Sequence, residues 1–551
     1  GPTGNGETQM APLGVGSFRV IAFDGLTGEF TLDGSADVVA QFPPGEVTSY
    51  ELHSGEEAPV VAIRRLMGLG LDRAIGPVEI RLGTTRATNA LLERKGARVA
   101  FVTTAGFGDV LRIGYQDRPD LFALQVRKRD ELAERVIEID ERMDARGRVL
   151  KSPDLARLRE QLEAAKTDGI DALAICLLHA HLNPTHEEQI ASAAEPLGFA
   201  QVSVSSRISR LEKIVPRGDT TVVDAYLGGV IRGYVDSLRR SMPHAAIRLM
   251  TSSGGLIDAS LASGKDTVLS GPAGGVVGCA YVTRTAGLDR AIGFDMGGTS
   301  TDVCRIEPPP APFEYQHETV KAGVRLQTPM LAVETVAAGG GSLCAFDGQK
   351  LTVGPRSAGA DPGPACYGRG GPLTITDVNL ALGRIVPGRF PFRLDSDRVD
   401  ALLAGLADAV HAATGERFSP IELADGYVRI ANANMADAIR RISLSKGYDV
   451  REYALTTFGG AGGQHACAIA RMLGVSRILC SPYAGVLSAV GIGMADVKRI
   501  AERSVQTPLT QEGIEALTPI LAAMIDKLRG SLLAEGIDQE TTAPPSRTME
   551  V

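Results

Sequence analysis

One short segment, from Ala291 to Arg305, constrains the fold more than any other part of the sequence. An apolar run ends in Asp295, two glycines and three hydroxyl residues follow, and a second apolar run begins at Asp302. This order predicts a strand, a tight turn and a second strand. Because glycine lets backbone N–H groups converge on an anion and carboxylates hold hydrated magnesium, the turn has the parts of a phosphate site. The alternative is an ordinary hairpin, in which the polar residues only stabilise the turn.

The chain around residues 150–205 alternates between helix and strand patterns. A helix is predicted from Ser152, a good N-cap, to about Gly169. The almost wholly apolar run 171–178 that follows has the composition of a strand covered by helices on both faces. A second helix is predicted to begin at Asn183, and 202–204 supplies another strand. These patterns predict an α/β fold.

The chain of 551 residues is 44% hydrophobic and 22% charged, which is enough for two to four domains, each with its own core. Two short strands, Phe18–Phe23 and Glu29–Leu32, are predicted near the N-terminus. The predicted parts are a small β element at 1–55, α/β domains at 56–212 and 213–505, and the incomplete start of a further domain at 506–551.

Charge and cysteine content exclude several classes of function. The net charge is −8 and no basic run is present, which argues against a nucleic-acid partner. The seven cysteines are widely spaced among apolar or glycine neighbours, as expected of reduced thiols in the cytosol. No apolar run reaches the roughly 20 residues of a membrane helix. We therefore expect a cytoplasmic protein without export signal or membrane span.

A second glycine cluster, Gly459 to Gly463, follows an apolar segment and precedes a helix predicted from His465 to Leu473. A glycine loop at a helix N-terminus can bind the adenosine or phosphates of a nucleotide, although close packing also explains it. Another loop joins Glu334 to three glycines and Ser342. It could present these two side chains to a substrate or surround an oxyanion with N–H groups, or it is a structural turn.

Other reactive side chains have weaker patterns. Cys366 has no identified histidine partner, so it is predicted to be structural rather than a nucleophile. His179, His181 and His186 lack the cysteine or carboxylate partners of a zinc site, and helix capping and packing explain them better. Three charged residues are candidates for anion binding or, equally, for ordinary salt bridges: Arg86, Arg217 and Asp219.

The 291–305 segment resembles the phosphate hairpin of the actin-like ATPases, in the form found in the hydantoinase A/oxoprolinase family. Between about residues 48 and 505, further stretches resemble signatures of this family in the expected order. They are Gly83–Arg94, Val136–Arg142, Leu177–Glu187, Thr221–Leu227, Ser270–Gly275, Gly359–Gly368 and Phe458–His465. Three stretches look most like the ATP-hydrolysing 5-oxoprolinases of the family: Ser54–Pro59, Gln116–Phe122 and Val215–Thr221.

The resemblance implies a two-lobed actin-like (ribonuclease H-like) ATPase fold with ATP and Mg²⁺ as cofactors. Asp295 and Asp302 would hold the metal and, with Glu334, form the catalytic set. The residues expected to bind phosphate are Gly297, Gly298, Thr299, Ser300 and Thr301. The residues expected on the adenosine side are Gly459, Gly460, Ala461, Gly462 and Gly463.

The activity implied by the resemblance is ATP-dependent opening of a cyclic amide, 5-oxoproline to glutamate, through phosphorylation of the amide oxygen. A hydantoinase B-like subunit or fused domain is the expected partner, in a homo- or hetero-oligomer. Family members begin with a first Asp-x-Gly-Gly-Thr loop that has no counterpart before Thr48, so a fragment is expected. The alternatives are an N-methylhydantoinase, an acetone or acetophenone carboxylase-type subunit, and a non-catalytic nucleotide-binding scaffold.

Overall fold

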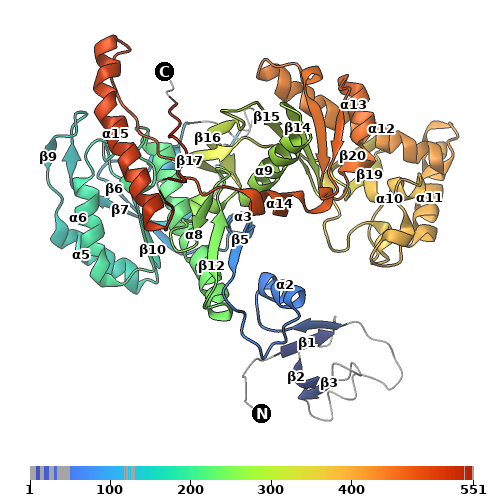
Figure 1. The fold of residues 1–551 in the computed structure, drawn as a ribbon, viewed down its shortest axis with the longest axis horizontal. Coiled ribbons are helices and arrows are strands. Elements are labelled where there is room, and N and C mark those ends of the chain that lie inside the picture. The colour runs from blue at the N-terminus through green and yellow to red at the C-terminus, as the bar shows by residue number, and fades with distance from the viewer. Residues whose placement is uncertain are drawn as a thin grey trace.

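The computed structural model describes residues 54–116, 118, 122, 124, 125, 131–538 and 540–548, and the backbone of four strands before them. These strands form an antiparallel sheet of order β3-β2-β1-β4 (Figure 1). Their bounds are Thr8–Pro12 (β1), Phe18–Phe23 (β2), Phe30–Asp33 (β3) and Tyr50–His53 (β4). The two strands predicted near the N-terminus are thereby confirmed.

A four-stranded parallel sheet of order β11-β10-β6-β7 follows in the chain. Its strands are Val99–Thr104 (β6), Ala133–Ile139 (β7), Ala172–Ile175 (β10) and Gln201–Val204 (β11). The helices Leu155–Thr167 (α5) and Thr185–Ala194 (α6) cover one face, and the 28-residue helix Ile214–Ser241 (α8) covers the other. Alternate strand residues enter the two cores, which explains the continuous apolar composition of β10.

The helix predicted from Ser152 begins slightly later. Asp154 is the N-cap of α5, and its carboxylate accepts a hydrogen bond from the backbone N–H of Arg157. The position of this cap was therefore predicted wrongly, because serine and aspartate both suit it and the sequence offers both within three residues.

A three-stranded sheet joins distant parts of the chain. Glu79–Leu82 (β5) pairs in parallel with Ala246–Met250 (β12), which pairs with Leu256–Asp258 (β13). This sheet crosses the boundary predicted near residue 212. Its neighbours in the chain are the helices Ala58–Met67 (α2) and Arg86–Leu92 (α3).

The sheet that carries the 291–305 segment is mixed and has the order β18-β15-β14-β21-β22. Its strands are Ala291–Met296 (β14), Thr301–Ile306 (β15), Glu334–Val336 (β18), Ala454–Phe458 (β21) and Ile478–Cys480 (β22). Helix Ser270–Thr285 (α9) packs on one face. Helices Pro420–Ser445 (α12) and Ala466–Leu473 (α13) pack on the other face. The helix predicted from His465 is confirmed with its first residue one position later.

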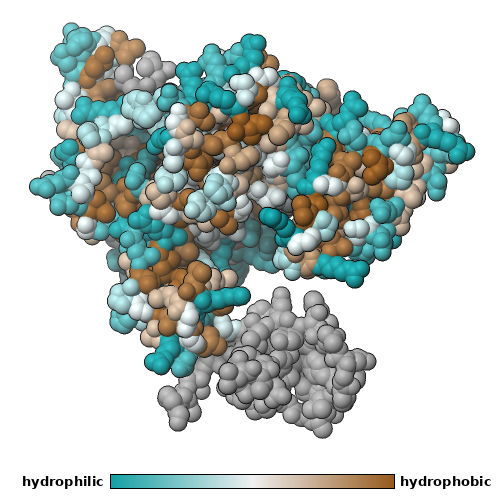
Figure 2. Space-filling view, turned by 45° about the vertical axis from the view of Figure 1, so that its right-hand side comes forward, coloured by the Kyte–Doolittle hydropathy of each residue, from teal (hydrophilic) through white to brown (hydrophobic). Residues whose placement is uncertain are grey.

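The other α-helices and three two-stranded sheets lie around these larger sheets (Figure 1). They are the helices Val110–Ile113 (α4), Ser205–Ile208 (α7), Ile375–Ala381 (α10), Ser396–Thr414 (α11), Leu487–Met494 (α14) and Gln511–Ala534 (α15), and the strand pairs Arg142–Met143 (β8) with Val149–Lys151 (β9), Tyr315–Lys321 (β16) with Val324–Leu331 (β17), and Ser342–Phe346 (β19) with Leu351–Ser357 (β20). Among the described residues, no helix has the length and apolar character needed to span a membrane. Polar and apolar residues intermingle on the face shown in Figure 2.

Helices α9 and α14 cross at backbone contact. A β-carbon on Gly491 of α14 would lie 1.9 Å from the carbonyl oxygen of Gly274 and 2.4 Å from the backbone nitrogen of Gly278, both in α9. Only glycine permits this approach, because any side chain would force the helices apart. The crossing therefore fixes α14 against the helix that covers β14.

We expect Gly491→Ala to lower the free energy of unfolding by about 2 kcal/mol or more, because its methyl group has no space at the crossing. Gly493→Ala is the matched control, since it lies in the same helix and a β-carbon there would have no atom within 4 Å. It should be neutral or stabilising by up to about 1 kcal/mol, because alanine favours helix. Urea unfolding of both variants measures the difference, and equal stabilities would contradict this account.

Candidate active site

Two carboxylates face each other across the β14–β15 hairpin. Asp295 and Asp302 are direct partners in the antiparallel register, and Thr335 of β18 is the next partner across the sheet. Directly paired residues point to the same side of a sheet. The two acids therefore project together toward α9, on the face opposite the core that contains Phe294 and Val303.

The surroundings disfavour negative charge at this pair. Burial, and then the charge of Asp302, raise the pKa of Asp295 to about 6. Burial also raises the pKa of Asp302, while the hydroxyl of Thr335 and the charge of Lys321 act in the opposite direction. A bound cation would relieve this repulsion, and paired carboxylates suit a divalent metal such as Mg²⁺. The chemistry of Asp295 and Asp302 therefore fits the predicted metal, and these two carboxylates would be its protein ligands.

Three glycine loops are tied together by backbone hydrogen bonds beside the carboxylates. Gly340 donates to the carbonyl of Gly297 over 3.0 Å, and Gly341 donates to that of Gly298. Ala461 donates to the carbonyl of Met296 over 3.0 Å. The loops around 297–300, 339–341 and 459–463 are thus one assembly, although they are far apart in the sequence.

The turn of the hairpin leaves N–H groups free. Gly298, Thr299 and Ser300 donate no backbone hydrogen bond to any described residue, and the first two are exposed. In the 459–463 loop, Gly460 and Gly463 are likewise exposed. Successive free N–H groups of this kind form a concave site for an anion.

The side chains of Thr301 and Glu334, which were predicted to belong to the site, point away from the turn and the two aspartates. Thr301 is fully buried and its hydroxyl donates to the carbonyl of Ala338, so the side chain points away from the turn. Glu334 pairs with Val303 and lies on the opposite face from the aspartates, because side chains alternate along a strand. Its carboxylate accepts from Gln316 and lies 3.9 Å from the ammonium of Lys446. The structure thus corrects the expectation that these two side chains join the others.

A buried histidine fixes the base of the 459–463 loop. The ring nitrogens of His465 lie 2.7 Å from Asn432 Oδ1 and 3.0 Å from Asn379 Nδ2. Burial, with a smaller contribution from Arg384, lowers the pKa of His465 to about 4. The neutral ring, which donates to one amide and accepts from the other, therefore holds the loop against α10 and α12.

Ser488 is a site residue that the sequence patterns did not indicate. A β-carbon placed on Gly275 of α9 would lie 3.2 Å from Ser488 Oγ and 3.4 Å from Asp295 Oδ2, so both oxygens face this bare backbone. No local pattern around Ser488 marks this position, because α14 reaches the carboxylates only through its crossing with α9.

The other candidates have structural partners. Asp377 accepts hydrogen bonds from the backbone N–H groups of Ala365 and Cys366. Burial and a hydrogen bond to Asp377 raise the pKa of the Cys366 thiol far above its usual range, which is unsuitable for a nucleophile. His186 lies 2.6 Å from Glu141. Among the described residues, no group of three or more histidine, cysteine or acidic side chains has the arrangement of a metal site.

The charged candidates are also paired. Arg86 contacts Glu57 and lies over the ring of Tyr234. Asp219 lies 3.6 Å from Arg325, and burial raises the pKa of Asp219 to about 7. The resemblance segment 116–122 lies largely outside the described residues.

The fold and this site define an α/β protein whose glycine turn and carboxylate pair have the chemistry to bind a phosphate group. Two family models match the sequence: Hydantoinase/oxoprolinase N-terminal region over residues 34–198, and Hydantoinase/oxoprolinase over residues 217–501. The chain therefore belongs to the hydantoinase/oxoprolinase family, which confirms the resemblance found in the sequence.

Curated relatives include 5-oxoprolinases. The 5-oxoprolinase of Saccharomyces cerevisiae is 41% identical over 489 residues, which cover 80% of this chain and 38% of the yeast protein. The 5-oxoprolinase 1 of Arabidopsis thaliana is 39% identical over 555 residues, covering 91% of this chain and 43% of the plant protein. The chain thus spans about two fifths of the length of these relatives.

Two solved structures share the architecture. The ATP-dependent caprolactamase from Pseudomonas jessenii superposes with a TM-score of 0.74 at 27% identity, over 94% of this chain and 75% of that chain. Nucleotide-free acetone carboxylase superposes with a TM-score of 0.66 at 22% identity, over 89% and 73% of the two chains. These likenesses confirm an α/β fold of the hydantoinase family.

We expect Gly459→Ala to damage the site. Gly459 has a φ of +79°, and its β-carbon would lie 2.5 Å from both Asp295 Oδ1 and the carbonyl oxygen of Met296. The free energy of unfolding should fall by about 2 kcal/mol or more. Gly460→Ala has open space and should change stability by less than about 0.5 kcal/mol. Thermal unfolding of the pair tests this, and a Gly459→Ala variant as stable as the control would refute it.

The His465 ring predicts a pH dependence of stability. Its pKa is lower in the folded protein, about 4, than the ordinary 6.5, so the unfolded chain takes up a proton first as the pH falls. His465 therefore contributes stability above pH 6.5 that is lost by about pH 4, by roughly 2–3 kcal/mol. Urea unfolding at pH 7 and pH 4.5 should show a smaller loss for His465→Gln than for the wild type. Equal losses would rule out a neutral His465.

Proposed function

We propose that the chain is the nucleotide-binding part of an ATP-dependent enzyme that opens a cyclic amide, with 5-oxoproline as substrate and glutamate, ADP and phosphate as products. The observation that carries the proposal is the buried pair of Asp295 and Asp302 beside a glycine turn with free N–H groups. The 5-oxoprolinases among the relatives and the ATP-dependent caprolactamase among the structural neighbours support the choice of reaction.

In this proposal the backbone of Gly297 to Ser300 binds the phosphates of ATP, and Gly459 to Gly463 bind the adenosine side. Mg²⁺ held by Asp295 and Asp302 would neutralise charge on the phosphates. The free N–H groups of the turn orient the terminal phosphate toward the amide oxygen of the substrate. Phosphorylation of that oxygen, with ADP as the leaving group, activates the amide carbon toward water. Cleavage of the C–N bond in the water adduct opens the ring to an acyl phosphate, and a second water releases glutamate and phosphate.

We further infer an actin-like arrangement for the mixed sheet. Its first three strands in the chain, β14, β15 and β18, are antiparallel, and β21 and β22 extend the sheet in parallel on the other side of β14. The sheet of β5, β12 and β13 would belong to the other lobe. The hydrolytic step is assigned to a hydantoinase B-like subunit or region, because Asp295 and Asp302 serve the nucleotide in this proposal.

We expect Asp295→Asn to lower 5-oxoproline-dependent ATP hydrolysis by the full-length protein with its partner at least about a hundredfold. The same change should stabilise the chain at neutral pH by roughly 1–3 kcal/mol, since it removes a carboxylate whose pKa is raised. Asp289→Asn, an exposed change just before β14, is the control and should alter neither property.

Phosphate release assays with 5-oxoproline, caprolactam and hydantoin, together with calorimetric binding of Mg-ATP, measure these effects. Retention of ATP hydrolysis in Asp295→Asn would refute the role of the carboxylate pair. If caprolactam or hydantoin stimulates ATP hydrolysis and 5-oxoproline does not, the proposed substrate is wrong. The proposed ATP site would still stand.

A further inference from the structure

A second polar cluster lies at the carboxyl ends of β10 and β11, away from the glycine loops. Ligands of open parallel α/β sheets bind at this edge, because the connections that follow the strands meet there. The chain after β10 carries His181, and the chain after β11 carries Ser206 and Ser209. The first turns of α8 bring in Arg217.

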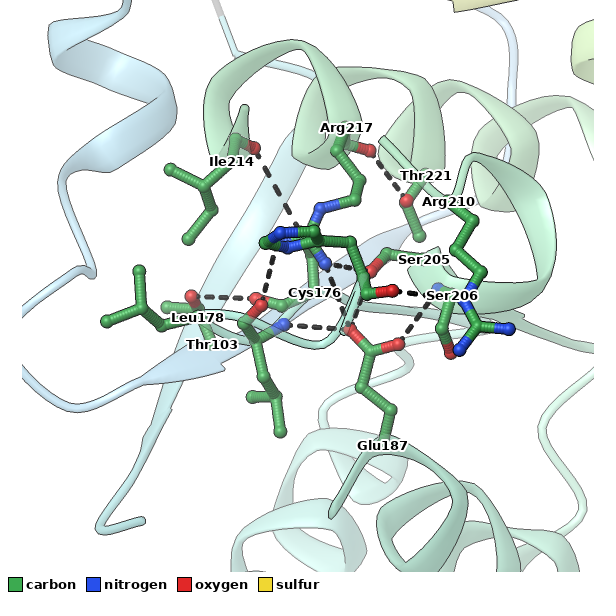
Figure 3. Close-up of polar contacts among 12 residues, drawn as sticks. Thr103, Cys176, Leu178, Glu187, Ser205, Ser206, Arg210, Ile214, Arg217 and Thr221 are labelled. Carbon is green, nitrogen blue, oxygen red and sulfur yellow. Dashed lines mark hydrogen bonds and ion pairs between the residues drawn. The ribbon is translucent and has the colours of Figure 1, made fainter. Parts of the chain in front are cut away.

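Arg217 is fully buried in this cluster and has an opposite charge beside it (Figure 3). Its Nη1 donates to Ser205 Oγ over 2.8 Å and its Nη2 to the carbonyl of Leu177 over 2.9 Å. Glu187 lies 3.8 Å from Nη1 and accepts from Leu177, Ser205 and Ser206. The two Nη atoms of Arg217 and the carboxylate of Glu187 therefore all have protein partners, so this ion pair needs no ligand.

Four other polar atoms in the cluster are buried and have no hydrogen-bond partner among the described residues. They are Arg217 Nε, His181 Nδ1, Ser206 Oγ and Ser209 Oγ. The side chains of His181 and Ser209 belong to residues only 4% and 7% exposed. Buried polar groups are nearly always satisfied, so four in one cluster indicate a missing partner.

Contacts place the residues that carry these atoms in one neighbourhood. Ser206 and Arg217 share Glu187, the first through its backbone N–H and the second through its charge. Arg210, which follows Ser209 directly, donates through Nε to the carbonyl of His181 over 3.0 Å.

A positive charge on His181 is disfavoured in the cluster. Burial, and then the charge of Arg217, lower the pKa of His181 to about 4, against the smaller opposite effect of Glu212. Burial and the charge of Arg503 lower the pKa of Arg210. The N-terminus of α8 has no capping side chain and no acidic residue in its first turn. The positive end of this long helix therefore adds to the positive potential.

We infer that the cluster of His181, Ser206, Ser209 and Arg217 binds a small carboxylate. The free groups are one N–H, two hydroxyls and one imidazole nitrogen, which match the acceptor sites of two carboxylate oxygens. A monoanion is favoured over a dianionic phosphate, because the buried charge of Arg217 is already balanced by Glu187. This inference does not depend on the proposed function, since it involves none of the residues assigned to ATP.

Isothermal titration of the chain with sodium acetate and sodium L-glutamate, at matched ionic strength and without nucleotide, tests the inference. Sodium phosphate is the comparison anion. We expect acetate or glutamate to bind and phosphate to bind at least about tenfold more weakly. Ser209→Ala should weaken carboxylate binding about tenfold, since a hydrogen bond to a charged group is lost.

Ser209→Ala should fold normally, because its hydroxyl has no partner to lose, and Ser206→Ala offers a second variant of the same kind. Asp289→Asn, an exposed change, is the control and should bind acetate like the wild type. Thermal unfolding gives an independent readout: carboxylate should raise the Tm of the wild type and not that of Ser209→Ala. Absence of carboxylate binding, tighter binding of phosphate, or unchanged binding by both serine variants would each overturn the inference.

Discussion

The repulsion between Asp295 and Asp302 is the constraint around which the nucleotide end of this protein is arranged. The register of β14 and β15 places two acids on one face of a sheet, where burial opposes ionisation of both. An apolar pair at these positions would make a more stable sheet. A cation between the two acids would relieve this repulsion, so the instability of the pair and the proposed role in binding metal have the same origin.

The surroundings of the pair consist largely of bare backbone. Gly339 and Gly459 approach the hairpin where a side chain would collide with it, and carbonyl groups of the hairpin accept hydrogen bonds from neighbouring loops. Among the described residues, the N–H groups of Gly298, Thr299 and Ser300 have no backbone partner, while the carbonyls of Gly297, Gly298 and Ser300 accept hydrogen bonds. A turn with its carbonyl groups occupied and its N–H groups free is selective for anions. Rigidity here comes from backbone contacts rather than from a side-chain core.

The sequence predicted the local features well, because they depend on neighbours in the chain. The β14–β15 hairpin follows from an apolar run, two glycines and a second apolar run, and the helix after Gly463 follows from the period of its apolar residues. What the sequence did not reveal depends on tertiary contact. Ser488 lies near Gly275 beside the carboxylates because α14 crosses α9, and Glu334 points to the opposite face because the register pairs it with Val303. The pairing of β5 with β12, which lie far apart in the chain, has no local signal either.

The crossing of α9 and α14 also links the two central sheets. Ile492 of α14 packs against Gly83, the residue after β5, and Arg81 of β5 donates to the carbonyl of Gly493 over 2.6 Å. In the same helix, Ser488 Oγ lies near Gly275 of α9, and so does Oδ2 of Asp295. The two helices are in backbone contact at these glycines. A shift of α14 along α9 would therefore alter the surroundings of Asp295 and of Gly83 together. The crossing therefore joins the packing around Asp295 to the packing around Gly83.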